Sequence, residues 1–251
     1  MIEAPASAAR NPRAAPKMTD EGSDRLSLPA GFLSKLAHET VGHLAAVQAS
    51  SYLLRKHGRE ISGAREQEWW SAIQKAGSRV QLIMDRLCRL EHALSGAVQP
   101  AEVDLALFLR DLAEQARLAG PATEVALDVR VRAGETWTGD AGLLEIATEC
   151  LLSNACKFGP PGTVAVLETR REGDFLEIRV TDAGPGLAPD EVARLFEPFF
   201  QGRNAKKNGG CGLGLAIARA AVNRLGGTIT YQPARGQGTE FRLCLPAVNR
   251  R

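Results

Sequence analysis

The N-terminal part of the chain has its apolar residues at helical spacing. Residues 28–55 predict a helix whose apolar stripe spans roughly 80° at about 100° per residue and is formed by Leu33, Leu36, Leu44, Val47 and Leu54. Ser27 is a candidate N-cap, and Pro29 stands in the first turn, where proline is favoured. His38 falls roughly opposite the stripe, in solvent, whereas His43 falls at its edge. His38 is therefore the more accessible imidazole, although a lone histidine on a helix is ordinarily only surface or packing.

A second helix is predicted after a loop at residues 57–63. Its apolar residues recur in alternating steps of four and three, which is typical of a heptad seam, at Trp69, Ile73, Ala76, Val80, Ile83, Leu87, Leu90 and Leu94. We interpret the Trp69-Trp70 pair as core and bundle-end packing. Two helices with one apolar stripe each bury more surface by pairing with a second copy than alone, so we expect a dimeric four-helix bundle.

Beyond a break at residues 95–100, helical and alternating patterns follow one another. Helices are predicted at 105–119 and 140–158, and strands at 125–132, 163–170, 174–181, 227–231 and 239–245, two of them joined as a hairpin around Glu172-Gly173. The antiparallel character favours an α+β sandwich. We therefore divide the chain into a disordered tail at 1–27, a helical hairpin at 28–97 and a sandwich domain at 101–248.

Composition excludes several classes of protein. A net charge of +2 over 251 residues, without a dense basic run, does not suggest a nucleic-acid surface. The five cysteines are an odd number without metal-like pairing, which fits reduced thiols better than a disulfide framework. No apolar run approaches the ~18 residues that a membrane span needs, and no signal-peptide core stands near Met1. We expect a soluble, cytoplasmic protein without membrane insertion.

Two glycine clusters suggest a nucleotide pocket. Asp182-Ala-Gly184-Pro-Gly186 and the run 209–214 flank the segment 195–200, and the second cluster leads directly into a helical pattern at 215–225. Glycine lets backbone N–H groups approach phosphate oxygens, and a helix N-terminus favours anions. Taken singly, each cluster could equally be a mobile surface turn. The chain has no Gly-Lys-Ser/Thr loop and no Gly-x-Gly-x-x-Gly after an opening strand, so the usual phosphate-loop and dinucleotide motifs are excluded.

An amide interrupts the apolar stripe of the helix that ends at Phe158. The apolar residues of this helix recur in steps of three and four, and Asn154, three positions after Leu151, stands where the next apolar residue would be expected. A buried or cleft-facing Asn needs partners, and these could be local backbone groups. Alternatively, Asn154 is an oxygen ligand for Mg²⁺ on a triphosphate, with Lys157 offering positive charge to the phosphates.

Taken together, these segments resemble the sequence boxes of sensor histidine kinases, in the same order and spacing. The boxes correspond here to Leu151-Leu-Ser-Asn154-Ala-Cys-Lys157-Phe158, Asp182-x-Gly184-x-Gly186, Phe196-Glu-Pro-Phe199, Gly210-x-Gly212-x-Gly214 and Gly236-x-Gly238-Thr239-x-Phe241. In the N-terminal half, Phe32-Leu-Ser-Lys-Leu-Ala-His38-Glu39 resembles the phosphoacceptor box of the dimerisation and histidine-phosphotransfer domain of that family. The resemblance covers roughly residues 29–246.

The resemblance implies an ATP-binding sandwich of the Bergerat type, shared with gyrase, Hsp90 and MutL ATPases, that uses ATP and Mg²⁺. Asp182 would accept a hydrogen bond from the adenine amino group, with Thr239 assisting through water, and Asn154 would hold Mg²⁺. Lys157 and the glycine backbone would contact phosphates beneath a lid at 201–209 that contains Lys206 and Lys207. The other ATP-binding positions implied are Phe158, Gly184, Gly186, Phe199, Gly210, Gly212, Leu213 and Gly214.

The same resemblance implies a phosphotransfer reaction. His38 would attack the γ-phosphate through Nε2, which suits an imidazole that is partly neutral near pH 7. Glu39 would accept a hydrogen bond from Nδ1–H and stabilise the developing positive charge. The expected protein is a homodimeric ATP-dependent protein-histidine kinase that passes its phosphoryl group to an Asp of a response-regulator receiver domain. Its input would come from an upstream sensor protein, the tail or another chain.

The chain departs from the family pattern at Cys150 and within the histidine box. Cys150 stands where a second Asn or an acid is common, and the adjacent Glu149 points about 100° away on the helix. Val41-Gly42-His43-Leu44 replaces a run similar to Arg-Thr-Pro-Leu. Gly42 takes the position of the Thr or Asn to which the family's receiver phosphatase activity is assigned, and Thr40 falls in the apolar stripe and cannot replace it. Receiver phosphatase activity is therefore expected to be weak or absent.

Two other classes of protein remain open. A kinase-like phosphotransfer or scaffold protein with a degenerate ATP domain would agree with Cys150 and the altered histidine box, but not with the intact glycine boxes and Asp182. A gyrase- or chaperone-like ATPase would share the pocket but would leave the helix pair around His38 unexplained.

Overall fold

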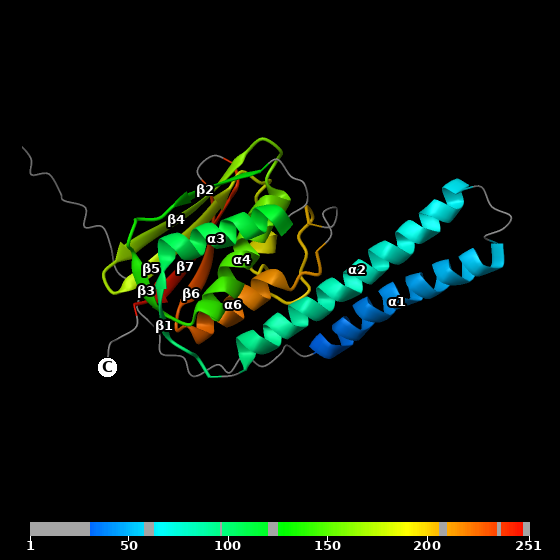
Figure 1. Cartoon of the computed structure of the whole chain (residues 1–251), viewed down its shortest axis with the longest axis horizontal. Helices are drawn as coiled ribbons and strands as arrows, with labels where there is room; N and C mark the ends of the chain where they lie inside the picture. The colour runs from blue at the N-terminus through cyan, green and yellow to red at the C-terminus, as the bar shows by residue number, and fades with distance from the viewer. Residues whose placement is uncertain are drawn as a thin grey trace, which may run out of the picture.

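A helical hairpin lies beside a two-layer sandwich (Figure 1). The computed structural model describes residues 31–57, 63–95, 97–119, 125–205, 210–234 and 237–247. The predicted tail at 1–27, and the helix start predicted at Ser27 and Pro29, fall outside the described residues. No described helix combines the length and apolar character that crossing a membrane requires.

The hairpin consists of two long antiparallel helices, α1 (Phe32–His57) and α2 (Gly63–Leu94). The heptad seam predicted for α2 is confirmed, since all eight of its residues are buried or half-buried. The stripe predicted for α1 is only partly covered, because Leu36, Val47 and Leu54 are half-buried while Leu33 and Leu44 are exposed. Within one chain, α1 therefore keeps part of its apolar surface in solvent.

The sandwich is built on a five-stranded sheet in the order β2-β4-β5-β7-β6. These strands are β2 (Ala126–Arg130), β4 (Val164–Glu172), β5 (Phe175–Asp182), β6 (Thr228–Pro233) and β7 (Thr239–Pro246). All neighbours are antiparallel except β2 and β4, which confirms the predicted hairpin and the α+β class. The sequence pattern missed a separate two-stranded sheet of β1 (Ala101–Asp104) and β3 (Thr136–Gly139), whose four-residue strands are too short to show a period.

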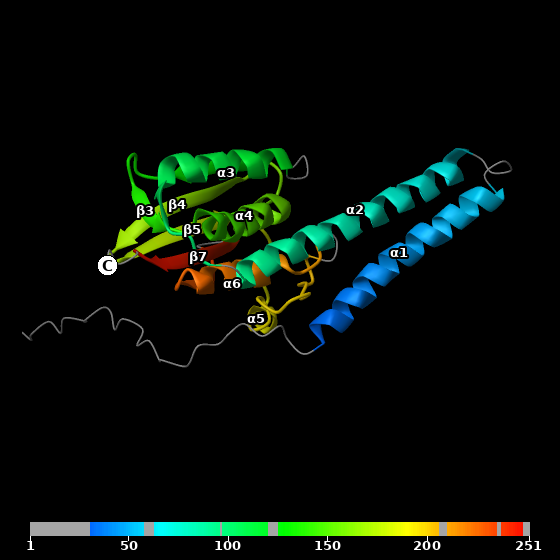
Figure 2. The same cartoon turned by 60° about the horizontal axis from the view of Figure 1, so that its bottom comes forward.

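Three helices cover one face of the sheet: α3 (Leu105–Ala119), α4 (Ala141–Phe158) and α6 (Gly214–Arg224) (Figure 1). α4 begins where Asp140 Oδ1 accepts a hydrogen bond from the Leu143 N–H at 3.1 Å, which is a normal N-cap. Its apolar positions join those of α6 and the sheet in one core cluster. A short helix, α5 (Pro189–Val192), stands at the edge of the sandwich (Figure 2).

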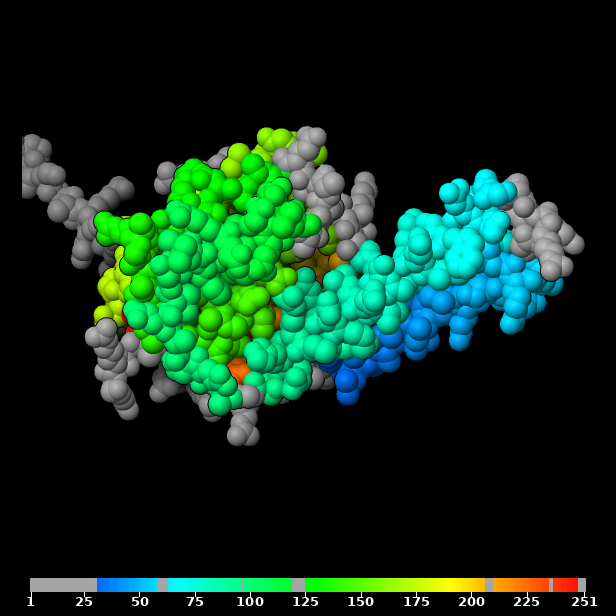
Figure 3. All heavy atoms as spheres, in the orientation of Figure 1, coloured from blue at the N-terminus to red at the C-terminus, as the bar shows by residue number. Residues whose placement is uncertain are grey.

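The C-terminal half of α2 fixes the hairpin against the sandwich. Arg89 forms an ion pair with Glu149 of α4, and the Arg224 guanidinium donates to the His92 carbonyl at 3.1 Å. At the start of α1, the Phe32 ring lies 5.2 Å from the Phe199 ring, centroid to centroid. The other half of the hairpin projects clear of the sandwich (Figure 3).

Candidate functional site

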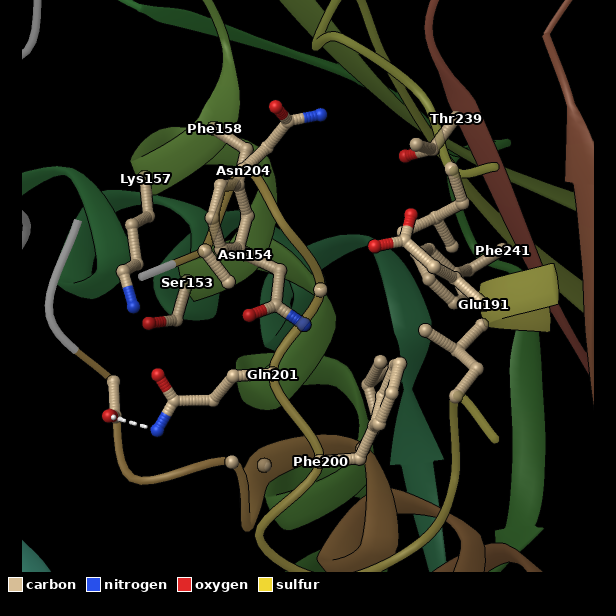
Figure 4. Close-up of a pocket in the computed structure, with 18 of the residues that line it drawn as sticks. Ser153, Asn154, Lys157, Phe158, Glu191, Phe200, Gln201, Asn204, Thr239 and Phe241 are labelled. Atoms are coloured by element: carbon tan, nitrogen blue, oxygen red, sulfur yellow. Dashed lines mark hydrogen bonds between the residues drawn. The ribbon is translucent and has the colours of Figure 1, made fainter. Parts of the chain in front are cut away.

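One cavity collects most of the residues that the motifs singled out (Figure 4). It lies between α4, the two glycine clusters, the start of β7 and one face of α2. Among its lining residues are Ser153, Asn154, Lys157, Phe158, Asp182, Gly186, Phe200, Gln201, Gly210, Gly212, Gly214, Thr239 and Phe241. The structure thus brings together segments that are widely separated in the sequence.

Asp182 ends β5 at one end of the cavity, directly opposite Thr239 of β7 in the strand register. Its side chain is buried, and its Oδ1 accepts a hydrogen bond from the Gly184 N–H at 2.7 Å while its Oδ2 accepts from the Thr239 hydroxyl. A Cβ on Gly184 would lie 2.6 Å from Oδ1, so this turn requires glycine. Burial raises the pKa of Asp182, and these hydrogen bonds partly offset that effect by favouring the carboxylate. The result is a fixed, desolvated acceptor suited to a purine amino group.

The second glycine cluster closes the other end of the cavity and leads into α6. Gly212 has φ +70°, and a Cβ there would lie 2.7 Å from the Phe199 carbonyl carbon and from the Phe200 oxygen. The Phe199 N–H donates to the Gly212 carbonyl at 2.8 Å, and Phe199 itself has φ 64°. The Gln201 amide nitrogen donates to the Gly210 carbonyl at 3.0 Å (Figure 4). The loop is therefore held close to the segment around Phe199, with the N-terminus of an eleven-residue helix directly after it.

Lys157 supplies positive charge to this end of the cavity. Its Nζ lies 5.0 Å from the centroid of the Phe158 ring. Burial lowers the pKa of Lys157, Arg79 and Arg86 lower it further, and Cys211 opposes them. A bound anion would offset the desolvation cost of this half-buried ammonium, so the electrostatics of the site favour a phosphorylated ligand.

The oxygen donors near Lys157 are compatible with a metal carried by a nucleotide. The described residues include no group of three or more His, Cys, Asp or Glu able to hold a metal ion. Asn154 and the Ser153 hydroxyl line the cavity, whereas the Glu149 carboxylate pairs with Arg89. Mg²⁺ usually keeps several waters and takes substrate phosphate oxygens, so one amide oxygen from Asn154 fits such an ion. The Cys150 thiol adds no ligand, because burial raises its pKa and a neutral thiol binds Mg²⁺ poorly.

The imidazole of His38 lies outside this cavity. His38 is exposed on α1, as predicted, and is not among the residues that line the cavity. Glu39 is exposed beside it, but its Oε2 lies 4.0 Å from Nε2 of His43, which is half-buried. Thr40 Oγ1 is buried without a hydrogen-bond partner within the described part of the chain, which agrees with its predicted inward position.

The predicted lid is described only in part. Gln201 lines the cavity together with Gly202, Asn204 and Ala205. Lys206, Lys207 and residues up to 209 fall outside the described residues, as does Gly236 of the last box.

The sequence reasoning missed the contribution of α2 to the cavity. Leu82 and Arg86 both line it, and so does Cys211 of the second glycine cluster. One signal was available for Arg86. Arg86 is a basic residue at the edge of the heptad seam, and no acidic residue stands three or four positions away from it on the helix.

Comparison with known proteins agrees with this geometry. Residues 139–249 match the family described as histidine kinase-, DNA gyrase B- and HSP90-like ATPase. Sensor-like histidine kinase SenX3 of Mycobacterium tuberculosis H37Rv is 34% identical over 149 residues, which cover 59% of this chain and 36% of SenX3. Sensor histidine kinase RcsC of Escherichia coli K12 is 43% identical over 110 residues, which cover 43% of this chain and 12% of RcsC. The chain thus matches well under half the length of either relative.

Solved structures extend the similarity to the hairpin. The histidine kinase AdeS of Acinetobacter baumannii superposes with a TM-score of 0.65 at 17% identity, over 84% of this chain and 98% of that one. A mycobacterial sensor histidine kinase, MprB, superposes with a TM-score of 0.53 at 30% identity, over 58% of this chain and 97% of that one. The similarity to AdeS is one of fold alone, and it covers helices and sandwich together.

Proposed function

Because the chain carries the transmitter core of a two-component histidine kinase, we propose that it autophosphorylates His38 from ATP and passes the phosphoryl group to an Asp of a response-regulator receiver domain. The observation that carries this proposal is the single cavity that joins the Asp182 acceptor, Asn154, Lys157 and the Gly210–Gly214 loop. Each group has the chemistry that one part of a nucleoside triphosphate needs.

Adenine would be recognised at Asp182, whose oxygens are already oriented by Gly184 and Thr239. Lys157 and the backbone N–H groups before α6 would neutralise and orient the phosphates. Asn154 would hold Mg²⁺, which when bound supplies charge neutralisation to the transferring phosphoryl group. The protein's contribution is then mainly positioning, since phosphoryl transfer needs little covalent chemistry from the protein itself.

His38 is the proposed acceptor because its imidazole is exposed on α1. In the transfer, a bond forms between Nε2 and the γ-phosphorus, the bond from that phosphorus to the β,γ-bridging oxygen breaks, and ADP leaves with the electron pair. Glu39 would accept from Nδ1–H and stabilise the positive charge on the ring; its side chain is 49% exposed and can turn from His43 to His38. Because His38 lies outside the cavity of its own chain, transfer requires the sandwich to move along the hairpin or to serve a second protomer.

A homodimer is the proposed assembly. Four large apolar side chains of α1 are exposed within about 100° of arc, namely Leu33, Val41, Leu44 and Tyr52. Pairing two hairpins in a four-helix bundle would cover this surface. The partners that we propose outside the dimer are the receiver domain and an upstream sensor protein.

The cytoplasm is the proposed compartment. All five cysteines are free thiols, which fits a reducing environment that also holds ATP. We further propose that receiver phosphatase activity is weak or absent, because Gly42 has no side chain to orient a water one turn after His38.

Incubation of the purified protein with radiolabelled ATP and Mg²⁺ tests the proposal. The expected product is protein-bound phosphate that is labile in acid and stable in base, as a phosphohistidine is. Absence of label, or label stable in acid, would overturn it.

A second candidate function is a scaffold or phosphotransfer protein with a degenerate ATP site, which the replacement at Cys150 favours. Calorimetry with ATP separates the two. The kinase proposal requires ATP binding, whereas a degenerate site would show no ATP binding.

A further inference from the structure

The cavity receives one basic residue from outside the sandwich. Arg79, Arg86 and Arg89 of α2 fall within about 80° on the helix, and the last two contact residues of α4. Arg89 pairs with Glu149. Arg86 is half-buried and lines the cavity beside Leu82, so among these three arginines it is the one in contact with the cavity space.

Arg86 uses few of its hydrogen-bond donors in this structure. Its Nη1 donates to Cys150 Sγ at 3.2 Å, and it forms no ion pair with any described residue. A thiol sulfur is a weak acceptor, whereas a guanidinium carries five N–H donors in a fork that matches phosphate oxygens. Cys150 is only 1% exposed, and burial raises its pKa, so its thiol stays neutral and offers no countercharge.

The identity of residue 150 matters for this contact. A carboxylate at that position would hold Arg86 in a charge-assisted pair and compete with a ligand. Because the Cys150 thiol is neutral, it does not balance the positive charge of the Arg86 guanidinium, which lies near Lys157. Two cations from two different elements, α2 and α4, thus converge on one end of the cavity.

We propose that Arg86 is a phosphate-binding residue, supplied by α2 to the terminal phosphates of the bound nucleotide. This inference rests on the proposed ATP site and adds to that site a residue from the hairpin. On binding, the guanidinium leaves Cys150 Sγ for phosphate oxygens and shares their negative charge with Lys157. The nucleotide would then bridge the hairpin and the sandwich, which no residue of the glycine boxes can do.

Calorimetric titration with ATP and with adenosine tests the proposal on Arg86→Gln. We expect the affinity for ATP to fall about tenfold, the lower end of what a charge-assisted hydrogen bond contributes, while the affinity for adenosine stays within about twofold. Arg65→Gln is the matched control, because Arg65 is an exposed arginine of the same helix outside the cavity. It should bind both ligands as the wild type does.

An Arg86→Gln protein that binds ATP with wild-type affinity would overturn the inference, and so would equal losses for ATP and adenosine, which would indicate a structural role. If the variant does not fold, modification of the wild type by phenylglyoxal replaces it. ATP should then protect Arg86 and adenosine should not, and equal modification with both would overturn the inference. Failure of the proposed nucleotide site has a different signature, since neither ligand would bind to the wild type.

Discussion

The hairpin and the sandwich differ in how much of their apolar surface one chain can bury. α4 has 18 residues and buries ten of them, whereas α1 has 26 and buries only Phe32 and Ser50. The sandwich closes its own core, so the groups around Asp182 are fixed by packing before any ligand arrives. The hairpin leaves Leu33, Val41 and Leu44 exposed and needs a second surface.

The proposed chemistry divides in the same way. The proposed adenine site, Lys157 and the glycine loop belong to the sandwich, whereas the proposed phosphoacceptor His38 belongs to the exposed face of the hairpin, and Arg86 of α2 joins the two regions at the cavity. Apart from Arg86, substitutions in one region should therefore leave the function of the other intact.

The largest effect is expected in the hairpin. His38→Gln should abolish labelling from radiolabelled ATP, because an amide cannot act as the nucleophile, while ATP affinity measured by calorimetry stays within about twofold of the wild type. His43→Gln is the control on the same helix and should keep its label. If His43→Gln loses the label and His38→Gln keeps it, the assignment of the acceptor is wrong.

A substitution that should weaken ATP binding, and leave the phosphoacceptor in place, lies in the sandwich. Asp182→Asn removes a charged acceptor and should weaken ATP binding by about tenfold to a hundredfold, since hydrogen bonds to charged groups contribute about 1.5–3 kcal/mol. Asp174→Asn, at the exposed turn of the same β-hairpin, should bind ATP normally. Equal ATP affinity in Asp182→Asn and the wild type would remove the adenine role from Asp182.

The two regions also differ in what the sequence could predict. The long helices and the strands of the main sheet have clear periods, and the glycine boxes have fixed spacing, so both were predicted from local pattern. β1 and β3 were missed because four residues carry no reliable period. Arg86 was missed because its place in the cavity depends on how α2 packs on α4, which is a tertiary property. The 4.0 Å approach of Glu39 to His43 is an i,i+4 contact that helical spacing does allow, and it was missed because the sequence reasoning paired Glu39 with His38 instead.

A smaller effect is expected at the junction of the two regions. Cys150→Asn should preserve autophosphorylation or raise it by up to a few-fold, because an amide oxygen can coordinate Mg²⁺ and can also accept from Arg86. Cys150→Ala offers neither and should give no gain. The measurement is the initial rate of labelling at saturating ATP. A large loss in Cys150→Asn would instead assign Cys150 a packing or redox role.

The smallest effect concerns the reverse reaction, and it tests whether the hairpin alone determines that activity. A Cβ at Gly42 would meet no atom within 4 Å, so Gly42→Thr fits on the exposed face of α1 without displacing a neighbour. Thr also has a higher helix propensity than Gly, so we expect the substitution to leave the stability of α1 intact. One turn after His38, the new hydroxyl could orient a water for attack on a receiver phosphate.

The assay adds each protein, with ADP but no ATP, to its phosphorylated regulator, in a His38→Gln background that excludes back-transfer. His38→Gln alone should leave the rate of phosphate release unchanged, and addition of Gly42→Thr should accelerate it measurably. Ala46→Thr places the same hydroxyl one turn further along the exposed face and should have no effect. Acceleration by His38→Gln alone would show that the phosphatase does not depend on a side chain at position 42, and the proposal of weak or absent activity would then be wrong.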